Sequence, residues 1–292
     1  MKEQIYILKN QESFNLKDIF ECGQCFRWNK NNDMSYTGVI KSGVINISKN
    51  EEKNEIIIKG KIFENEDLED IVRNYFDLET NYSQIKSVLS KVDEYLDESI
   101  KFGEGIRILK QDFWEIIISF IISANNNIPR IKKIIENLSR KYGNKIEWEN
   151  KVYYTFPDAE NLSRATIDDL RQLGLGFRDK RIFNTTQKIL NKEFDLEKIS
   201  KLDDTDLIKN ELLKLDGVGP KVADCILLFA LHRFDVFPID VWVRRVMNEL
   251  YIHNEDEEKV KKEDIIKLAK EKFKDYQAMA QQYLFYWKRE NS

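Results

Sequence analysis

Lys221 follows two closely spaced glycines, Gly217 and Gly219, in residues 215–221 (LDGVGPK). Glycines accept the positive φ of a tight turn between two helices, and they let backbone N–H groups approach a phosphate. The partial positive charge of a helix N-terminus favours that anion and disfavours a charged ammonium. Because a neutral amine is a nucleophile, the segment predicts a DNA-backbone contact with a candidate covalent catalyst attached.

Asp240 lies 19 residues after Lys221, behind a segment (FPI, residues 237–239) that interrupts a helical pattern. With one helix and one loop between them, the two side chains could face each other. A lysine amine can attack C1′ of a sugar to form a Schiff base, while a carboxylate stabilises the developing positive charge or moves protons. The pair suits cleavage of an N-glycosidic bond, although a surface lysine and an ordinary helix cap would explain the same spacing.

The first third of the chain has an α+β pattern. Short β-type segments separated by Gly, Asn, Asp and Lys predict an antiparallel sheet. These segments lie at residues 5–8, 35–40, 44–48 and 55–58, with a hairpin turn at residues 41–43. From residue 67 to residue 100 the apolar residues recur at helical spacing. We therefore expect an N-terminal α+β domain at residues 1–104.

After about Gly105 almost every segment has a helical pattern. Residues 113–123 are nearly all apolar and predict a buried central helix, and Pro129 can open the next one. The other expected elements are a glycine-bearing turn at 173–176, a buried helix at 222–231, a helix from Val241 capped by Asp240, and a last helix from about 275 to 287. Residues 105–292 should form a mostly α-helical core, with a helix–hairpin–helix at about residues 205–232.

Composition narrows the class of protein. The chain has 292 residues and a net charge of −4. It has no run of about 18 apolar residues and no signal-peptide core at its start, so we expect no membrane contact and a cytoplasmic location, nucleoid-associated if the source is bacterial. Basic residues nevertheless gather in residues 128–145 (six basic, one acidic) and 171–188 (five basic, one acidic). Basic segments of this kind are typical of proteins that contact phosphate groups, although either segment could simply be exposed to solvent.

Three cysteines, Cys22, Cys25 and Cys225, do not indicate a disulfide framework. A zinc site would need Cys225 and a histidine to join the Cys22–Cys25 pair, and no second ligand pair has metal spacing. A four-cysteine iron–sulfur cluster is excluded by number. We expect no required cofactor.

Four segments, in order along the chain, resemble motifs of the helix–hairpin–helix DNA glycosylases, and within them of the 8-oxoguanine DNA glycosylase/AP lyases. They are residues 23–28 (GQCFRW), 119–128 (SFIISANNNI), 215–225 (LDGVGPKVADC) and 236–241 (VFPIDV). Matching positions run from Gly23 to Phe285 and cover nearly the whole chain. The resemblance implies an N-terminal antiparallel-sheet domain followed by a helical glycosylase core.

The resemblance also implies catalytic roles. Lys221 would be the nucleophile and Asp240 its acidic partner, while Gly217 and Gly219 would hold the DNA backbone. The Gly23 carbonyl would accept the N7–H of 8-oxoguanine. Guanine has a lone pair at that position, which a fixed carbonyl repels, so the site would discriminate strongly.

Three further residues would contact the flipped base. Phe285 would stack on it, Gln281 would bind its Watson–Crick edge, and Cys225 would face the pocket from one helical turn after Lys221. Simple packing of Cys225 and Phe285 within their helices stays open as an alternative.

On the other strand, the resemblance implies that Asn125 fills the space left by the flipped base. Arg130 and Arg178 would contact the opposite cytosine, with Phe177 as an aromatic wedge beside it. Both arginines could equally bind phosphates.

One position departs from the family pattern. Trp242 stands where the family often has a phosphate-binding histidine, and a tryptophan has only one N–H donor. We carry no phosphate role to Trp242. A structural monovalent or divalent cation could be held by backbone carbonyls of the hairpin, at Leu213, Leu215 and Val218.

The sequence therefore predicts a bifunctional DNA repair enzyme, a monomer that binds double-stranded DNA containing 8-oxoguanine. It would excise the base, preferentially opposite cytosine, through a lysine Schiff base and then cleave the abasic strand by β-elimination. Two other interpretations stay open. A monofunctional glycosylase for alkylated bases needs Asp240 but not Lys221, and a non-catalytic helix–hairpin–helix DNA-binding protein needs neither.

Overall fold

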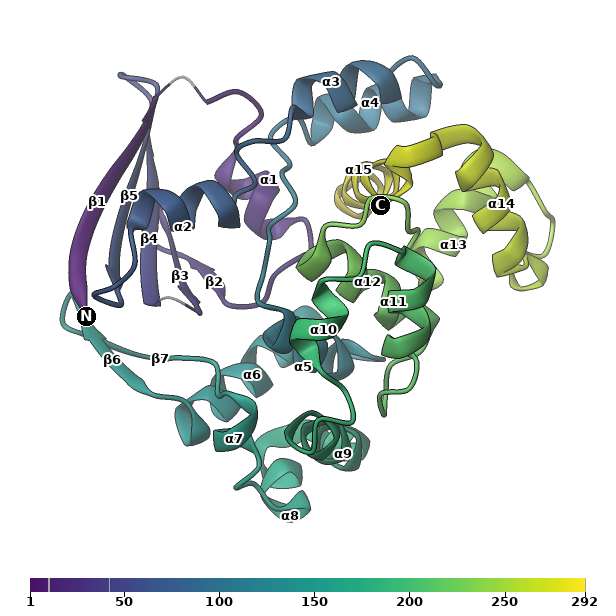
Figure 1. The fold of residues 1–292 in the computed structure, drawn as a ribbon. Helices are drawn as coiled ribbons and strands as arrows, with labels where there is room; N and C mark the ends of the chain where they lie inside the picture. Colours follow the sequence, from purple (N-terminus) through teal and green to yellow (C-terminus); the bar gives the residue numbers. More distant parts are fainter. Residues whose placement is uncertain (10, 42, 292) are drawn as a thin grey trace.

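A five-stranded antiparallel sheet forms one end of the molecule (Figure 1). The computed structural model describes residues 1–9, 11–41 and 43–291. The strands are β1 (Lys2–Lys9), β2 (Trp28–Lys30), β3 (Tyr36–Ile40), β4 (Gly43–Asn50) and β5 (Glu55–Ile62), in the order β1-β5-β4-β3-β2. The four predicted strands are confirmed, and β2 is an additional short one. Of the predicted turn at residues 41–43, Ser42 lies outside the described residues, while Ile40 pairs with Gly43 on either side of it.

Four helices accompany the sheet: α1 (Leu16–Glu21), α2 (Leu68–Tyr75), α3 (Tyr82–Leu89) and α4 (Glu94–Phe102). Leu68 and Val72 of α2 share a buried cluster with Ile45 and Ile58 of the sheet. By contrast, α3 and α4 contribute to the larger apolar cluster of the helical part, and α4 packs on the last helix. The domain division between residues 104 and 105 stays a prediction.

The helical part is built around two crossing apolar helices. Phe120 of α5 stacks on Phe229 of α12, with ring centroids 5.5 Å apart. The elements are α5 (Phe113–Ser123), α6 (Ile128–Tyr142), α7 (Ala159–Leu162), α8 (Ile167–Leu170), η1 (Arg171–Leu175), η2 (Gly176–Arg178), α9 (Asp179–Leu190), α10 (Leu196–Ser200), α11 (Thr205–Leu212), α12 (Pro220–Leu231), α13 (Val241–Met247), η3 (Asn248–Ile252), η4 (Glu257–Lys259), α14 (Lys262–Phe273), η5 (Lys274–Tyr276) and α15 (Gln277–Glu290). The predicted α+β class with a helical core is confirmed.

One element of the helical region, a short β-hairpin, was not predicted. Strands β6 (Lys145–Trp148) and β7 (Lys151–Tyr154) form a hairpin within the helical region. Its two turn residues, Glu149 and Asn150, have φ of 48° and 59°, as a tight hairpin turn requires. Trp148 packs on Val39 and Val44 of the sheet. The hairpin therefore depends on a tertiary contact that local pattern does not reveal.

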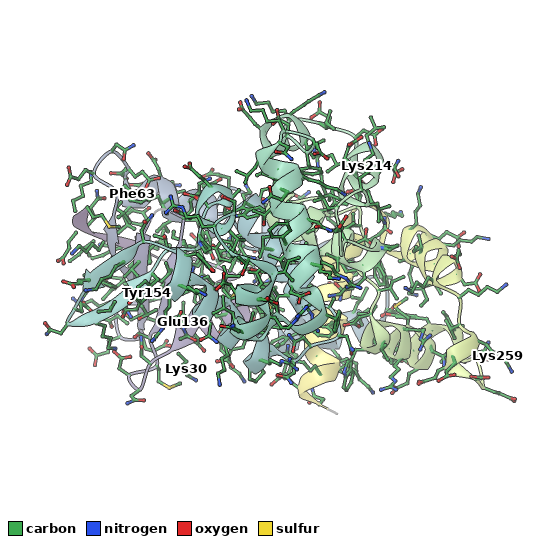
Figure 2. The ribbon with its side chains drawn as sticks, turned by 90° about the horizontal axis from the view of Figure 1, so that it is seen from below. Lys30, Phe63, Glu136, Tyr154, Lys214 and Lys259 are labelled. Atoms are coloured by element: carbon green, nitrogen blue, oxygen red, sulfur yellow. The ribbon has the colours of Figure 1, made fainter. Side chains whose placement is uncertain are left out.

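The molecule is elongated when seen from below (Figure 2). Phe63 and Tyr154 lie toward the end that holds the sheet, and Lys259 marks the opposite end. Within residues 1–9, 11–41 and 43–291, no helix has the length and apolar character needed to cross a membrane.

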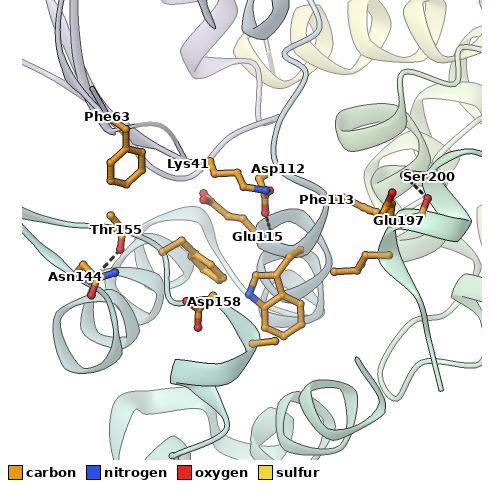
Figure 3. A pocket seen from close by; sticks show the side chains of 14 residues that line it. Lys41, Phe63, Asp112, Phe113, Glu115, Asn144, Thr155, Asp158, Glu197 and Ser200 are labelled. Carbon is orange, nitrogen blue, oxygen red and sulfur yellow. Dashed lines mark hydrogen bonds and ion pairs between the residues drawn. The ribbon is translucent and has the colours of Figure 1, made fainter. Parts of the chain in front are cut away.

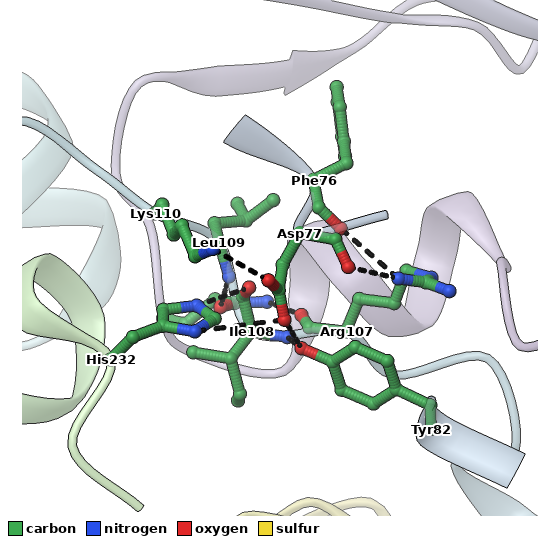
Figure 4. A network of polar contacts seen from close by, with 9 residues as sticks. Phe76, Asp77, Tyr82, Arg107, Ile108, Leu109, Lys110 and His232 are labelled. Atoms are coloured by element: carbon green, nitrogen blue, oxygen red, sulfur yellow. Dashed lines mark hydrogen bonds and ion pairs between the residues drawn. The ribbon is translucent and has the colours of Figure 1, made fainter. Parts of the chain in front are cut away.

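A buried polar network ties the C-terminal end of α12 to the N-terminal part (Figure 4). Asp77 is 1% exposed and accepts a hydrogen bond from the Tyr82 hydroxyl at 2.9 Å. Lys110 Nζ lies 2.8 Å from Asp77 Oδ1, and His232 Nδ1 lies 3.6 Å from Oδ2, the oxygen that accepts from Tyr82. The His232 ring also makes a 3.0 Å hydrogen bond with the Ile108 carbonyl through Nε2. This network fixes the far end of the helix that begins beside Lys221.

His232 should make this junction acid-sensitive. Burial lowers the pKa of His232 to about 4, below the value of about 6.5 in an unfolded chain. The unfolded state therefore binds the proton first, and stability that is present above pH 6.5 is lost as the pH falls toward 4. The full decrease in the free energy of unfolding is about 3 kcal/mol. We expect His232→Asn to flatten the decrease in unfolding temperature between pH 7 and pH 5.

His253 provides a matched control for this measurement. It is exposed and, like His232, has a left-handed backbone at a helix end, with φ of 57° against 56°. Asparagine tolerates this conformation, so neither substitution adds backbone strain. An unchanged pH profile in His232→Asn, or an equal effect of His253→Asn, would contradict the assignment.

Candidate active site

The hairpin between α11 and α12 presents an open N-terminus. Gly217 has φ of +90°, and a Cβ there would lie 2.9 Å from Arg181 Cδ and 3.0 Å from Ile121 Cγ2. A Cβ at Gly219 would meet nothing within 4 Å, and no side chain caps the helix that follows. At position 217 any other residue would have a strained backbone and a crowded side chain, so glycine is required there. Gly219, by contrast, leaves the first N–H groups of α12 accessible to an anion.

Helix α9 holds this hairpin in place. Asp216 accepts hydrogen bonds from Asn184 Nδ2 at 2.6 Å and Lys188 Nζ at 2.9 Å, which lower its pKa. Lys188 Nζ also donates to the Lys214 carbonyl at 2.7 Å, and the Thr185 hydroxyl donates to the Asp216 carbonyl at 3.1 Å. These hydrogen bonds from α9 therefore fix the turn on the side that faces the rest of the protein.

Lys221 occupies the first turn of α12, beside the centre of the core. Its Nζ lies 5.3 Å from the centre of the Phe120 ring. Cys225, one turn later, is 4% exposed, and burial raises the pKa of its thiol to about 11. The charge of Lys221 opposes this shift and the charge of Asp240 adds to it, so both groups act on one buried thiol. The thiol is neutral at physiological pH.

Asp240 caps α13 as predicted. Its Oδ1 accepts the Val243 N–H at 2.8 Å. In the part of the chain that the structure describes, Asp240 makes no ion pair with Lys221, and its carboxylate is held in place by the capping bond. Trp242, on the next turn, is 41% exposed.

The loop after α1 packs against the last helix, α15, where the predicted lesion-binding residues lie. Gly23 has φ of +93°, and a Cβ there would lie 3.4 Å from Phe285 Cε1. Gln282 Nε2 donates to the Cys22 carbonyl at 2.7 Å, which binds α15 to this loop. Gln281 on the same helix is 6% exposed. Two predicted lesion contacts, Gly23 and Phe285, are thus neighbours although they lie 262 positions apart in the sequence.

Replacing Gly23 with alanine should impair the site. Alanine at φ of +93° is strained, and its methyl group would lie 3.3 Å from Arg289 Nη1 and 3.4 Å from Phe285 Cε1. We expect a loss of about 1–3 kcal/mol in transition-state stabilisation, seen as a 5- to 100-fold lower single-turnover excision rate, roughly. Gly176→Ala is the matched control, because Gly176 also has positive φ (+56°) but has nothing within 4 Å of its Cβ position. Unchanged excision by Gly23→Ala would argue against its placement at the base.

The predicted residues for the opposite strand also cluster. Asn125 has a left-handed backbone, with φ of 52°, directly after α5. Arg178 is 2% exposed and donates to the carbonyls of Ala124 and Asn125, the latter at 2.9 Å. Phe177 is 56% exposed, with the Arg178 guanidinium carbon 4.2 Å from its ring centre. Arg178 thus holds the Asn125 backbone in place.

Positive charge is concentrated beside this loop. Arg130 Nη2 lies 3.5 Å from the Gly174 carbonyl. Burial lowers the pKa of Arg178, and the charges of Arg130 and Arg181 lower it further. The Arg181 guanidinium carbon lies 5.1 Å from the Phe177 ring centre. Sequence reasoning missed Arg181, although its position three residues after Arg178 on a helix could have indicated it.

A separate pocket of about 560 Å³ lies between the sheet, α5 and α10 (Figure 3). Glu115 lines it, and burial raises the pKa of that carboxyl to about 7. At its rim Lys41 Nζ lies 2.9 Å from Asp112. None of the predicted site residues lines this pocket, so it is distinct from the candidate active site.

A metal ion could be held either by side chains or by the backbone carbonyls of the hairpin. Within the described residues, no group of three or more His, Cys, Asp or Glu side chains could hold a metal ion. At the hairpin, the Leu215 carbonyl accepts the Val218 N–H at 3.1 Å. Among the turn and cap hydrogen bonds of the described residues, none ends on the carbonyls of Leu213 and Val218, so these oxygens are compatible with a hard cation.

An interhelical glycine hairpin, a lysine at its second helix and a capping aspartate at the next helix fit a DNA glycosylase of the helix–hairpin–helix class. Comparisons with known families agree. Residues 6–117 match the 8-oxoguanine DNA glycosylase N-terminal domain, and residues 118–276 match the HhH-GPD superfamily base excision DNA repair proteins. The chain belongs to the 8-oxoguanine DNA glycosylase/lyase family within that superfamily.

Individual relatives support the assignment. The N-glycosylase/DNA lyase of Saccharomyces cerevisiae is 35% identical over 265 residues, which cover 83% of this chain and 69% of the yeast protein. A probable N-glycosylase/DNA lyase of Methanothermobacter thermautotrophicus is 35% identical over 60% of each chain. The Clostridium acetobutylicum 8-oxoguanine glycosylase/lyase, solved with double-stranded DNA containing cytosine opposite 8-oxoguanine, is 42% identical. It superposes with a TM-score of 0.92 over 99% of this chain and 97% of that one.

Proposed function

We propose that this enzyme excises 8-oxoguanine from duplex DNA, preferentially opposite cytosine, and then cleaves the abasic strand through a Schiff base on Lys221. The observation that carries the proposal is that a lysine and an aspartate stand at the starts of two successive helices. Lys221 lies in the first turn of α12, directly after the glycine hairpin, with its Nζ 5.3 Å from the centre of the Phe120 ring. Asp240 caps α13, the next helix along the chain.

The chemical steps follow from these two groups. The Lys221 amine attacks C1′ as the N-glycosidic bond breaks, and the base leaves with the bonding electrons and takes up a proton. The Asp240 carboxylate stabilises the positive charge on the sugar. The attached nitrogen then loses a proton, the C1′–O4′ bond breaks and O4′ takes up a proton, which leaves an open-chain Schiff base. Removal of a C2′ proton then expels the 3′ phosphate, and hydrolysis frees Lys221.

The lesion is recognised on the side of the site formed by Gly23, Gln281 and Phe285. The Gly23 carbonyl accepts the N7–H that only the oxidised base carries. Phe285 stacks on the base, which offsets part of the cost of extruding it. Gln281 is positioned to bind its Watson–Crick edge, and the neutral thiol of Cys225 closes the pocket.

Cytosine preference is assigned to the loop around Asn125. Cytosine has acceptors at N3 and O2, which suit the guanidinium donors of Arg130 and Arg178. For Arg178 to reach them, its hydrogen bonds to the Ala124 and Asn125 carbonyls must be exchanged for bonds to the base. Phe177, exposed beside the loop, acts as the wedge.

The hairpin holds the DNA backbone through the accessible N–H groups near Gly219 and the strained turn at Gly217. A cation on the carbonyls of Leu213, Leu215 and Val218 would add positive charge for a phosphate. The enzyme needs no other cofactor and acts as a monomer in this proposal.

A substrate panel tests this function. The protein is incubated with 8-oxoguanine opposite cytosine or adenine, and with 3-methyladenine duplexes, and base release and strand scission are scored separately. We expect both products from 8-oxoguanine, with faster release opposite cytosine. Base release without scission, or release of only the alkylated base, would favour a monofunctional glycosylase. Binding without release would indicate a non-catalytic module.

A further inference from the structure

Arg289 lies at the lesion side of the site, one helical turn after Phe285 on α15. A Cβ built at Gly23 would lie 3.3 Å from Arg289 Nη1, closer than it lies to Phe285. The Arg289 guanidinium carbon is 5.4 Å from the centre of the Phe285 ring. Arg289 is therefore in contact with both residues that are proposed to hold the damaged base.

The hydrogen bonds of Arg289 occupy only one edge of its guanidinium group. Nε donates to Glu290 Oε1 at 3.0 Å, and Nη2 donates to Glu290 Oε1 at 2.9 Å and to the Glu21 carbonyl. Nη1 is buried and has no hydrogen-bond partner among the residues that the structure describes. An arginine has five N–H donors, and the two on Nη1 are the ones that face Gly23.

A buried charged donor without a partner is costly, and such groups in native structures call for an explanation. The bonds to Glu290 and Glu21 hold the guanidinium plane still, so Nη1 is fixed in position. Since Nη1 makes no hydrogen bond within the described residues and lies beside Gly23 and the Phe285 ring, an acceptor on a base bound there would satisfy it.

We infer that Arg289 Nη1 donates a hydrogen bond to a carbonyl oxygen of the flipped base. This rests on the proposed function, because it takes Gly23 and Phe285 to be the base-binding residues. In 8-oxoguanine the N7–H lies between two carbonyl oxygens, O6 and O8. A donor beside the Gly23 carbonyl faces one of these oxygens. The Gly23 carbonyl would then bind the N7–H, and Arg289 Nη1 would bind the carbonyl oxygen next to it. Arg289 is thus a further base-binding residue.

Arg289→Met tests the inference, because methionine keeps an apolar stem and removes the donors. A charge-assisted hydrogen bond lost from a buried site should lower single-turnover excision of 8-oxoguanine opposite cytosine by about 10- to 100-fold. Cleavage of a preformed abasic site, which has no base, should stay within about twofold of the wild type. Arg289→Lys, which retains a cation, should lie between the wild type and Arg289→Met.

Arg73→Met is the matched control, since Arg73 is a half-exposed arginine of α2 that also pairs with carboxylates. It should leave both reactions unchanged. Equal losses on both substrates in Arg289→Met would overturn the inference, because they indicate a phosphate contact or a purely structural role, as would an unchanged excision rate. A wild-type protein that cleaves abasic sites but leaves 8-oxoguanine in place would overturn the proposed function and the base contact together.

Discussion

Lys221→Gln should abolish strand cleavage and reduce base excision by about 10³-fold or more, the scale seen when a catalytic nucleophile is removed. Glutamine matches the length of much of the lysine stem but offers an amide, which is not a nucleophile at neutral pH. The substitution leaves the hairpin intact, because Gly217, Asp216 and their contacts to α9 do not involve the Lys221 amine. DNA binding should therefore be retained.

The measurement is single-turnover excision and scission on 8-oxoguanine opposite cytosine, with binding followed separately. Lys270→Gln, at an exposed position of α14, removes the same charge away from the site and should behave as the wild type. If Lys221→Gln kept strand cleavage, another amine would have to be the nucleophile.

Asp240→Asn should separate the two roles of Asp240. Asparagine is as good an N-cap as aspartate, so the bond to the Val243 N–H is preserved and the free energy of unfolding should change by less than about 0.5 kcal/mol. The neutral amide cannot stabilise positive charge on the sugar or accept a proton. We expect excision to fall by about 10²- to 10⁴-fold. Asp240→Ala should show the same loss and destabilise the protein by about 1 kcal/mol besides.

Asp204 offers a control for capping alone. It caps α11, the first helix of the hairpin, by accepting the Leu207 N–H at 2.9 Å. Asp204→Asn should be neutral in both stability and excision. If Asp240→Asn were fully active, Asp240 would be a helix cap and not a chemical participant.

Local sequence signals predicted the hairpin and its caps well. Gly217 has the positive φ that the turn required, and Asp240 caps the helix that begins at Val241. The apolar run at residues 113–123 coincides with α5. These features depend on steric and capping preferences that act within a few residues, so the sequence contains nearly all the information they need.

Features that depend on contacts between distant segments were harder to predict. The β6–β7 hairpin is stabilised where Trp148 meets the sheet. Arg178 turns inward to the Ala124 and Asn125 carbonyls because the chain leaves α5 there with a left-handed residue. The position of Arg289 beside Gly23 follows from the packing of α15 on the loop after α1. Sequence spacing alone gives no distance between these segments.

The most direct test of a lysine-based mechanism is reductive trapping. The wild-type enzyme is mixed with 8-oxoguanine opposite cytosine, borohydride is added during turnover, and the adduct is digested for mass spectrometry. We expect a covalent enzyme–DNA complex whose sugar remnant is attached to Lys221, and no complex with Lys221→Gln. Strand cleavage without any adduct, or a remnant attached to another amine, would contradict the mechanism.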